Sequence, residues 1–212
     1  SSAGGIAPRG ARGEKPFGVQ SCAATGGGEG KGSMVRIEPL GDDATPETLA
    51  GIERIFFASS RRQSFASEAE RSAFREQWLG RYLLHDRQHA FVARAEDGTI
   101  AGYLIGSVDD PAVAQRFAEV GFFAELADLT ERFPAHLHIN LDAAWRSQGI
   151  GAQLVETFAE HAAALGAPGV HIVTGAGARN ARFYERCGFA PLRELDWHGS
   201  ALLFMGRDLA SG

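Results

Sequence analysis

The chain has 212 residues, of which 44% are hydrophobic and 22% charged, and its formal net charge is -5 at pH 7. This composition is typical of one soluble globular domain with additional residues, and the length suffices to bury a core without disulfides or metal. Residues 34–212 are more acidic than the whole chain, because residues 1–33 carry four Lys or Arg and two Asp or Glu. The acidic balance argues against wrapping nucleic acid or an anionic membrane surface.

Signals for a cell compartment or a bound metal are few. No apolar run is long enough to span a bilayer, and the N-terminus lacks the apolar core of a signal peptide. The two cysteines form no C-x-x-C pair, and no zinc-ligand spacing occurs. We therefore expect a cytoplasmic protein with no metal site.

Residues 1–33 differ from the rest of the chain in composition. They are dominated by Gly, Ala and Ser, and no apolar period survives a full helical turn. Such a segment cannot bury enough apolar surface to offset the entropy of ordering it. We expect residues 1–33 to be a flexible leader and residues 34–212 to form one domain.

The first half of this domain predicts a strand, two helices and a hairpin. The strand lies at 34–40, and Thr45-Pro46 marks the start of the first helix, with proline at the first helical position. Ser67 and Glu70 form a capping box that begins the second helix. Two strands over 89–108 flank an Asp97-Gly98 turn.

The second half continues with alternating helices and strands. Residues 111–133 are rich in Phe and predict helical or irregular structure that either roofs a pocket or packs in the core. The remaining elements are a strand at 136–142, a helix at 150–165, a strand at 170–174, a helix at 179–187 and two strands over 190–208. This order predicts an α/β or α+β sheet covered by helices.

The strand at 136–142 carries an unusual set of side chains. His136, His138, Asn140 and Asp142 alternate with aliphatic residues, so the four polar groups share one face. A strand in the middle of a sheet is normally apolar on both faces. The polar face therefore either borders an acceptor pocket, with His138 as a base poised near neutral pH, or forms a buried hydrogen-bonded network.

A glycine loop, Arg146–Gly151, follows directly. Glycines allow a tight turn, and the unpaired first amides of the following helix favour a phosphate group, to which Arg146 adds a cation. A dinucleotide-binding fingerprint would need a third glycine early in a βαβ unit, whereas this loop has only G-x-G and comes late in the chain, which argues against a nicotinamide dinucleotide. A plain strand-to-helix turn remains the alternative for the loop taken alone.

The loop sequence, Arg-x-x-Gly-x-Gly, resembles the Q/R-x-x-G-x-G/A signature of the GNAT (Gcn5-related N-acetyltransferase) superfamily. The stretch "NARFYERCGF", Asn180–Phe189, is similar to the second element of that superfamily. The two occur in the expected order, with a helix and a strand between them. The resemblance implies a GNAT fold, with a mixed central sheet of about six to seven strands and helices on both faces.

The resemblance also implies acetyl-CoA as the acyl donor and direct transfer of acetyl to an amine, with a homodimer as a possible assembly. It places Tyr184 as the acid that meets the departing thiolate, and we add His138 and Asp142 as further candidates for catalysis. The amine itself, a small molecule or a lysine, is not identified by the sequence. The residues expected to hold acetyl-CoA are Leu141, Asp142, Ala143, Arg146, Ser147, Gln148, Gly149, Ile150, Gly151, Asn180 and Tyr184.

A narrower similarity concerns "FPAHLHINL", which resembles the acetyltransferase-like domain of O-GlcNAc hydrolases and its free-standing bacterial relatives. That resemblance implies an alternative function. The chain would then be a catalytically silent module that binds acetyl-CoA and acts as a sensor or partner domain.

Overall fold

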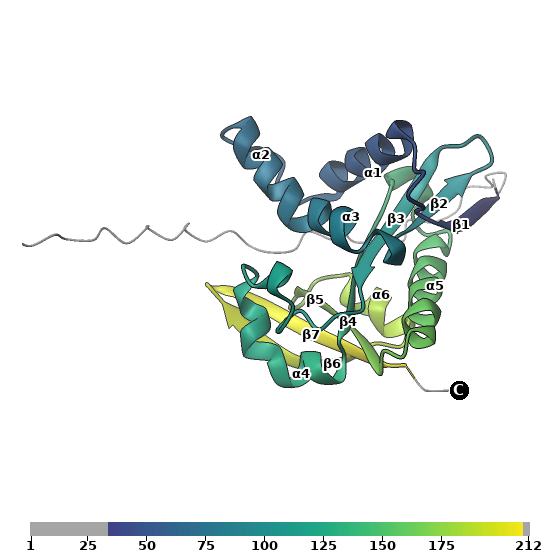
Figure 1. Cartoon of the computed structure of the whole chain (residues 1–212). Coiled ribbons are helices and arrows are strands. Elements are labelled where there is room, and N and C mark those ends of the chain that lie inside the picture. The colour runs from purple at the N-terminus through teal and green to yellow at the C-terminus, as the bar shows by residue number, and fades with distance from the viewer. Residues whose placement is uncertain (1–33, 210–212) are drawn as a thin grey trace, which may run out of the picture.

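A single mixed sheet of seven strands organises the computed structural model, which describes residues 34–209 (Figure 1). The predicted leader at 1–33 lies outside the described residues. The spatial order of the strands is β1-β2-β3-β4-β5-β7-β6, and β4 and β5 run parallel whereas every other neighbouring pair is antiparallel. The strands are β1 (Val35–Pro39), β2 (Phe91–Ala95), β3 (Ile100–Ser107), β4 (Ala135–Leu141), β5 (Gly169–Gly175), β6 (Ala190–Trp197) and β7 (Ser200–Asp208).

The helices begin where the capping residues predict. Thr45 caps the first helix by accepting the Thr48 N–H at 3.3 Å, and Ser67 caps the second by accepting the Glu70 N–H at 3.2 Å. Glu70 completes its half of the capping box one residue early, on the Ala66 N–H. The helices are α1 (Pro46–Ser59), α2 (Glu68–Arg75), α3 (Arg81–His85), α4 (Ala127–Arg132), α5 (Ile150–Ala164) and α6 (Ala181–Arg186).

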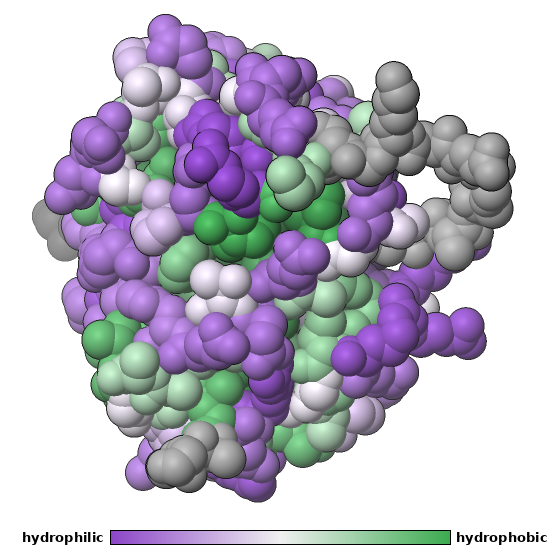
Figure 2. All heavy atoms as spheres, turned by 90° about the vertical axis from the view of Figure 1, so that its right-hand side faces the viewer, coloured by the Kyte–Doolittle hydropathy of each residue, from purple (hydrophilic) through white to green (hydrophobic). Residues whose placement is uncertain are grey.

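Helices cover both faces of the sheet, as expected (Figure 1). On one face, α1, α3 and the segment between β3 and β4 pack against a core that includes Tyr103 and Phe204. On the other face, α5 and α6 pack against the aliphatic residues of β4 and against Met205. Figure 2 looks at the side of the molecule where α5 and β1 lie, and mainly hydrophilic side chains surround the hydrophobic ones exposed there.

The phenylalanine-rich segment belongs to the core. It forms short 3-10 turns at Gln115–Phe117 and Gly121–Leu126 before α4 begins. Its phenylalanine side chains are at most 6% exposed, so packing accounts for the apolar content of this segment. These buried rings are Phe117, Phe122, Phe123 and Phe133.

Main-chain pairing between β4 and β5 stops early. The two strands pair only at Ala135–Val170 and His136–His171, and we call the divergence beyond these pairs the β4–β5 gap. Asp142 donates its N–H to the Ala101 carbonyl on the β3 side at 2.9 Å. Because main-chain groups of successive strand residues point to alternate sides, those of Ile139 and Leu141 face the gap.

Across residues 34–209, no helix combines the length and the apolar content needed to cross a bilayer.

Candidate active site

The glycine loop, Arg146–Gly151, places unpaired amides at the start of α5. Ser147 and Gly149 have left-handed backbones, with φ of 63° and 81°. The first main-chain bond of the helix runs from the Gln153 N–H to the Gly149 carbonyl at 3.1 Å. The amides of residues 150–152 therefore have no acceptor within the helix. With the helix dipole, they form a site suited to an anion such as a diphosphate.

Two long side chains of this loop bond to neighbouring carbonyls. Arg146 donates from Nε and Nη2 to the Leu141 carbonyl at 3.3 and 3.2 Å. Gln148 donates to the Ala144 carbonyl at 3.0 Å. Arg146 therefore fixes the end of β4 and brings its positive charge to the base of the loop.

The two sequence motifs meet at Gly151. A β-carbon there would lie 3.2 Å from the Phe183 ring and 3.4 Å from a methyl group of Leu141. This close approach joins the start of α5, the middle of α6 and the end of β4. Tyr184, the residue after Phe183, is 2% exposed and belongs to the same core cluster as Leu141. The predicted acid is therefore buried on the face of the sheet that α5 and α6 cover.

Asn180 sits immediately before α6 and is 4% exposed. Its Oδ1 accepts the Thr174 hydroxyl at 3.0 Å, which ties the helix to the end of β5. Its Nδ2 is buried and has no hydrogen-bond partner among residues 34–209. A buried donor without an acceptor is costly, so this amide fits a ligand carbonyl.

The polar face of β4 meets tyrosines on the side of α1 and α3. His138 Nε2 lies 3.1 Å from the Tyr82 hydroxyl, and Asn140 donates to the Tyr103 hydroxyl at 2.8 Å. His136 is 3% exposed, and its Nδ1 lies 3.3 Å from the Pro134 carbonyl. His138 and Asn140 each bond to a tyrosine and keep partial exposure, whereas the buried His136 Nε2 has no hydrogen-bond partner among residues 34–209.

Burial lowers the pKa of His138 to about 4, and repulsion from His171 and Arg81 adds to the effect. The imidazole is therefore neutral at pH 7, and its pKa lies well below the near-neutral value expected from the sequence. A neutral imidazole can accept a proton, but one with this pKa is a weak base.

Asp142 is held as a carboxylate. Arg54 of α1 donates to its Oδ2 at 2.6 Å, and the Ala144 N–H donates to its Oδ1 at 3.1 Å. The hydrogen bond from Arg54 is the main reason that the pKa of Asp142 is lowered. The side chain anchors α1 and the turn at 143–145 to the end of β4, which makes it a poor proton acceptor at neutral pH.

A buried histidine of the same cluster predicts acid sensitivity. His171 is 1% exposed, stacks between His136 and Phe204 at ring distances of 5.4 and 4.6 Å, and burial lowers its pKa to about 4. In the unfolded chain the imidazole titrates near 6.5, so below that pH the unfolded state binds more protons. We expect the free energy of unfolding to fall by about 3 kcal/mol from this group as the pH drops from 6.5 to 4.

Urea unfolding at several pH values measures this effect. The variant His171→Phe should make this dependence less steep, with the remaining slope carried by the buried His136 and His138, and the exposed His85→Gln should leave the slope unchanged. An unchanged slope in His171→Phe would show that other groups carry the acid sensitivity.

Three partners of the site could not be read from the motifs. Arg54, Tyr82 and Tyr103 lie 88, 56 and 37 positions from the β4 residues that they contact. The Tyr82 side chain is 3% exposed and packs in the core. Its hydroxyl gave no sequence signal, because only the fold brings it to His138. Within the part of the chain that the structure describes, no cluster of three or more His, Cys, Asp or Glu could hold a metal ion.

No curated protein sequence matches the chain significantly. Among solved structures, SsHAT matches with a TM-score of 0.63 at 23% identity, over 83% of this chain and 98% of that one. An N-acetyltransferase from Staphylococcus aureus Mu50 matches with a TM-score of 0.57 at 19% identity, over 84% and 100% of the two chains.

A chain of the NatC complex bound to Gag peptide and CoA matches with a TM-score of 0.58 at 16% identity, over 83% of this chain and 99% of that one. At these identities the matches establish the shared fold. The family model described as "Acetyltransferase (GNAT) family" matches residues 49–189, which is most of the domain. The chain therefore belongs to the GNAT family of acetyltransferases.

Proposed function

We propose that the protein is an N-acetyltransferase that uses acetyl-CoA and transfers the acetyl group directly to an amine. One observation carries this proposal. The β4–β5 gap and the unpaired amides of the glycine loop lie at the carboxyl end of β4, and Tyr184 belongs to the core cluster that contains Leu141. A single extended ligand with an anionic end and a reactive carbonyl end fits this arrangement. Membership of the GNAT family and the CoA named for the NatC structure support acetyl-CoA as that ligand.

Each part of the donor has a counterpart in the chain. The amides of 150–152 and the turn at Ser147–Gly149 would bind the diphosphate. Main-chain groups of Ile139 and Leu141 would bond to the pantetheine arm, as a neighbouring strand would, and the buried Asn180 Nδ2 would donate to one of its carbonyls. When bound, acetyl-CoA supplies a thioester whose carbonyl carbon is open to attack by an amine.

Proton handling would occur on both sides of the gap. Strand alternation puts His138 on the face covered by α1 and α3, whereas Tyr184 lies on the face covered by α5 and α6. His138 would take a proton from the amine, and Tyr184 would give one to the departing thiolate. A gap-facing amide of β4 would donate to the carbonyl oxygen as charge develops on it.

Thiol release tests the proposal. The protein is incubated with acetyl-CoA and a broad panel of amines, and the free thiol is measured against time. Acceptor-dependent release supports the transferase. If calorimetry detects acetyl-CoA binding but no amine increases thiol release, the transferase proposal fails.

The base assignment makes a separate prediction. His138→Gln should lower kcat by about 10-fold, a modest effect because an imidazole with a pKa near 4 is a weak base. The acid limb of kcat against pH should lie near 4 in the unchanged protein. Steady-state kinetics between pH 4 and 8 measure both, and an acid limb near 6.5 would contradict the assignment.

A specific observation favours a second candidate, the silent module that binds acetyl-CoA. His138 and Asn140 bond to Tyr82 and Tyr103 within the protein, and Asp142 is tied to Arg54. The similarity of "FPAHLHINL" to the O-GlcNAc hydrolase group points the same way. In either case we propose that the protein acts in the cytoplasm. The thiol-release panel separates the two candidates.

A further inference from the structure

A small cavity opens at the carboxyl end of β5. It has a volume of about 290 Å³ and is lined by residues 175–178 after β5, by residues 199–202 of the β6–β7 turn and by Arg61. The Ala176 N–H donates to the Ala201 carbonyl at 2.8 Å and joins these two segments. Apart from Arg61, all lining side chains are uncharged, and most are glycine or alanine.

Arg61 reaches this cavity from the other half of the sheet. It follows α1, which packs on β3 and β4, whereas the rest of the lining belongs to β5, β6 and β7. Its Nη1 lies 4.0 Å from the position that a β-carbon would take at Gly175. Arg61 therefore links the end of α1 to the carboxyl end of β5, beyond the point where β4 and β5 cease to pair.

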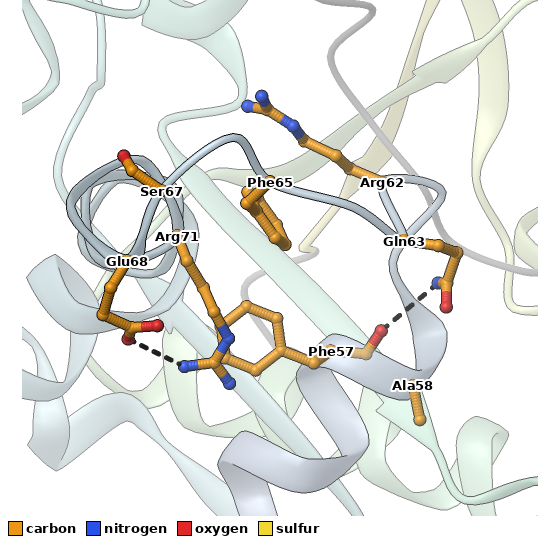
Figure 3. A pocket seen from close by; sticks show the side chains of 8 residues that line it. All are labelled: Phe57, Ala58, Arg62, Gln63, Phe65, Ser67, Glu68 and Arg71. Carbon is orange, nitrogen blue, oxygen red and sulfur yellow. Dashed lines mark hydrogen bonds and ion pairs between the residues drawn. The ribbon is translucent and has the colours of Figure 1, made fainter.

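Two neighbouring arginines, Arg62 and Arg71, already have acidic partners. Arg62 pairs with Glu70, and Arg71 pairs with Glu68 and lies 3.7 Å from the centre of the Phe57 ring. Figure 3 shows this neighbouring pocket, in which the Arg71 side chain lies along Phe57 and reaches Glu68. Arg61, in contrast, forms no ion pair or hydrogen bond within residues 34–209.

We propose that Arg61 binds a carboxylate on the acceptor, so that the enzyme acts on small amines that also carry an acidic group, such as amino acids. The inference rests on the proposed transfer reaction, because it places the acceptor at the mouth of the gap. A guanidinium presents two parallel N–H groups that match the two oxygens of a carboxylate. The cavity supplies room for that group and no competing acid.

Matched pairs of amines test the proposal. Each pair consists of an amino acid and the amine that lacks its carboxyl group: phenylalanine with phenethylamine, tyrosine with tyramine, and lysine with cadaverine. We expect kcat/KM to favour the amino acid in at least one pair. In Arg61→Gln, kcat/KM for the amino acid should fall roughly 10- to 100-fold, which is the loss expected for a charged hydrogen bond. The kcat/KM for the decarboxylated amine should be unchanged. Arg61→Lys should restore part of the preference.

A second arginine variant serves as the control for the loss of positive charge. Arg36→Gln removes an exposed arginine at the far edge of the sheet and should leave both members of each pair unchanged. Equal turnover within every pair, or an unaffected Arg61→Gln, overturns the proposal.

If no amine is acetylated, the same compounds are titrated calorimetrically into protein saturated with CoA. Carboxylate-dependent binding that Arg61→Gln abolishes would support the site even though the transfer proposal had failed. Binding that is absent or indifferent to the carboxyl group overturns the site.

Discussion

Replacing Gly149 with valine should abolish measurable binding of acetyl-CoA, with a Kd raised about 100-fold or more. Gly149 has φ of 81°, and a β-branched residue held there is strained by about 1–3 kcal/mol. No atom lies within 4 Å of an added β-carbon, so the side chain would occupy open space beside the helix amides. The change would both shift those amides and obstruct the anion. Isothermal titration with acetyl-CoA measures the loss.

A matched glycine provides the control for strain. Gly98, in the β2–β3 turn, has φ of 85° and equally open surroundings. Gly98→Val should lower stability by a similar amount and leave the Kd for acetyl-CoA unchanged. If Gly149→Val binds as tightly as the Gly98 variant, the glycine loop is not the diphosphate site.

Tyr184→Phe should lower kcat by about 10²- to 10³-fold with little change in the Kd for acetyl-CoA, because it removes only the hydroxyl that we propose protonates the leaving thiolate. The ring is 2% exposed and packs at 5.6 Å from Phe189, so phenylalanine fits the same space. Thiol release at saturating donor and acceptor, together with titration of the donor, separates the two effects.

Removing a buried tyrosine hydroxyl on the other face of the sheet tests whether the effect on kcat is particular to Tyr184. Tyr103 is 1% exposed, and its hydroxyl accepts the Asn140 amide. Tyr103→Phe should cost about 1 kcal/mol of stability and leave kcat within a factor of about two, since it lies outside the proton path. A full kcat in Tyr184→Phe would assign the acid to another group.

Local sequence signals predicted most of the fold. Thr45-Pro46, Ser67 with Glu70, and Asp97-Gly98 each mark a boundary through contacts within a few residues, and the structure has elements that begin or turn there. The same holds for the glycine loop, whose left-handed Gly149 precedes α5 as expected. Such signals survive in a single sequence because the interactions that cause them are short-range.

Long-range contacts could not be predicted in this way. The polar face of β4 was recognised from its alternation, but the alternation could not identify Tyr82, Tyr103 or Arg54 as the groups that meet it. The pKa of His138 could not be predicted either, because it depends on which distant residues pack around the ring. The near-neutral value assumed a solvated pocket, whereas packing beneath α3 buries the ring and favours its neutral form. Nothing in the sequence indicated that Arg61 lines a cavity, because only the fold brings residues 175–178 and 199–202 next to it.

The early end of β4–β5 pairing has a mechanical consequence. Two residue pairs are all the main-chain ladder that joins strands β1–β4 to strands β5–β7. The rings of His136, His171 and Phe123 contact one another across this junction, with centroid distances of 5.4 to 5.9 Å. A substitution in that aromatic cluster would therefore weaken the contact between strands β1–β4 and strands β5–β7, although the cluster lies at neither edge of the sheet.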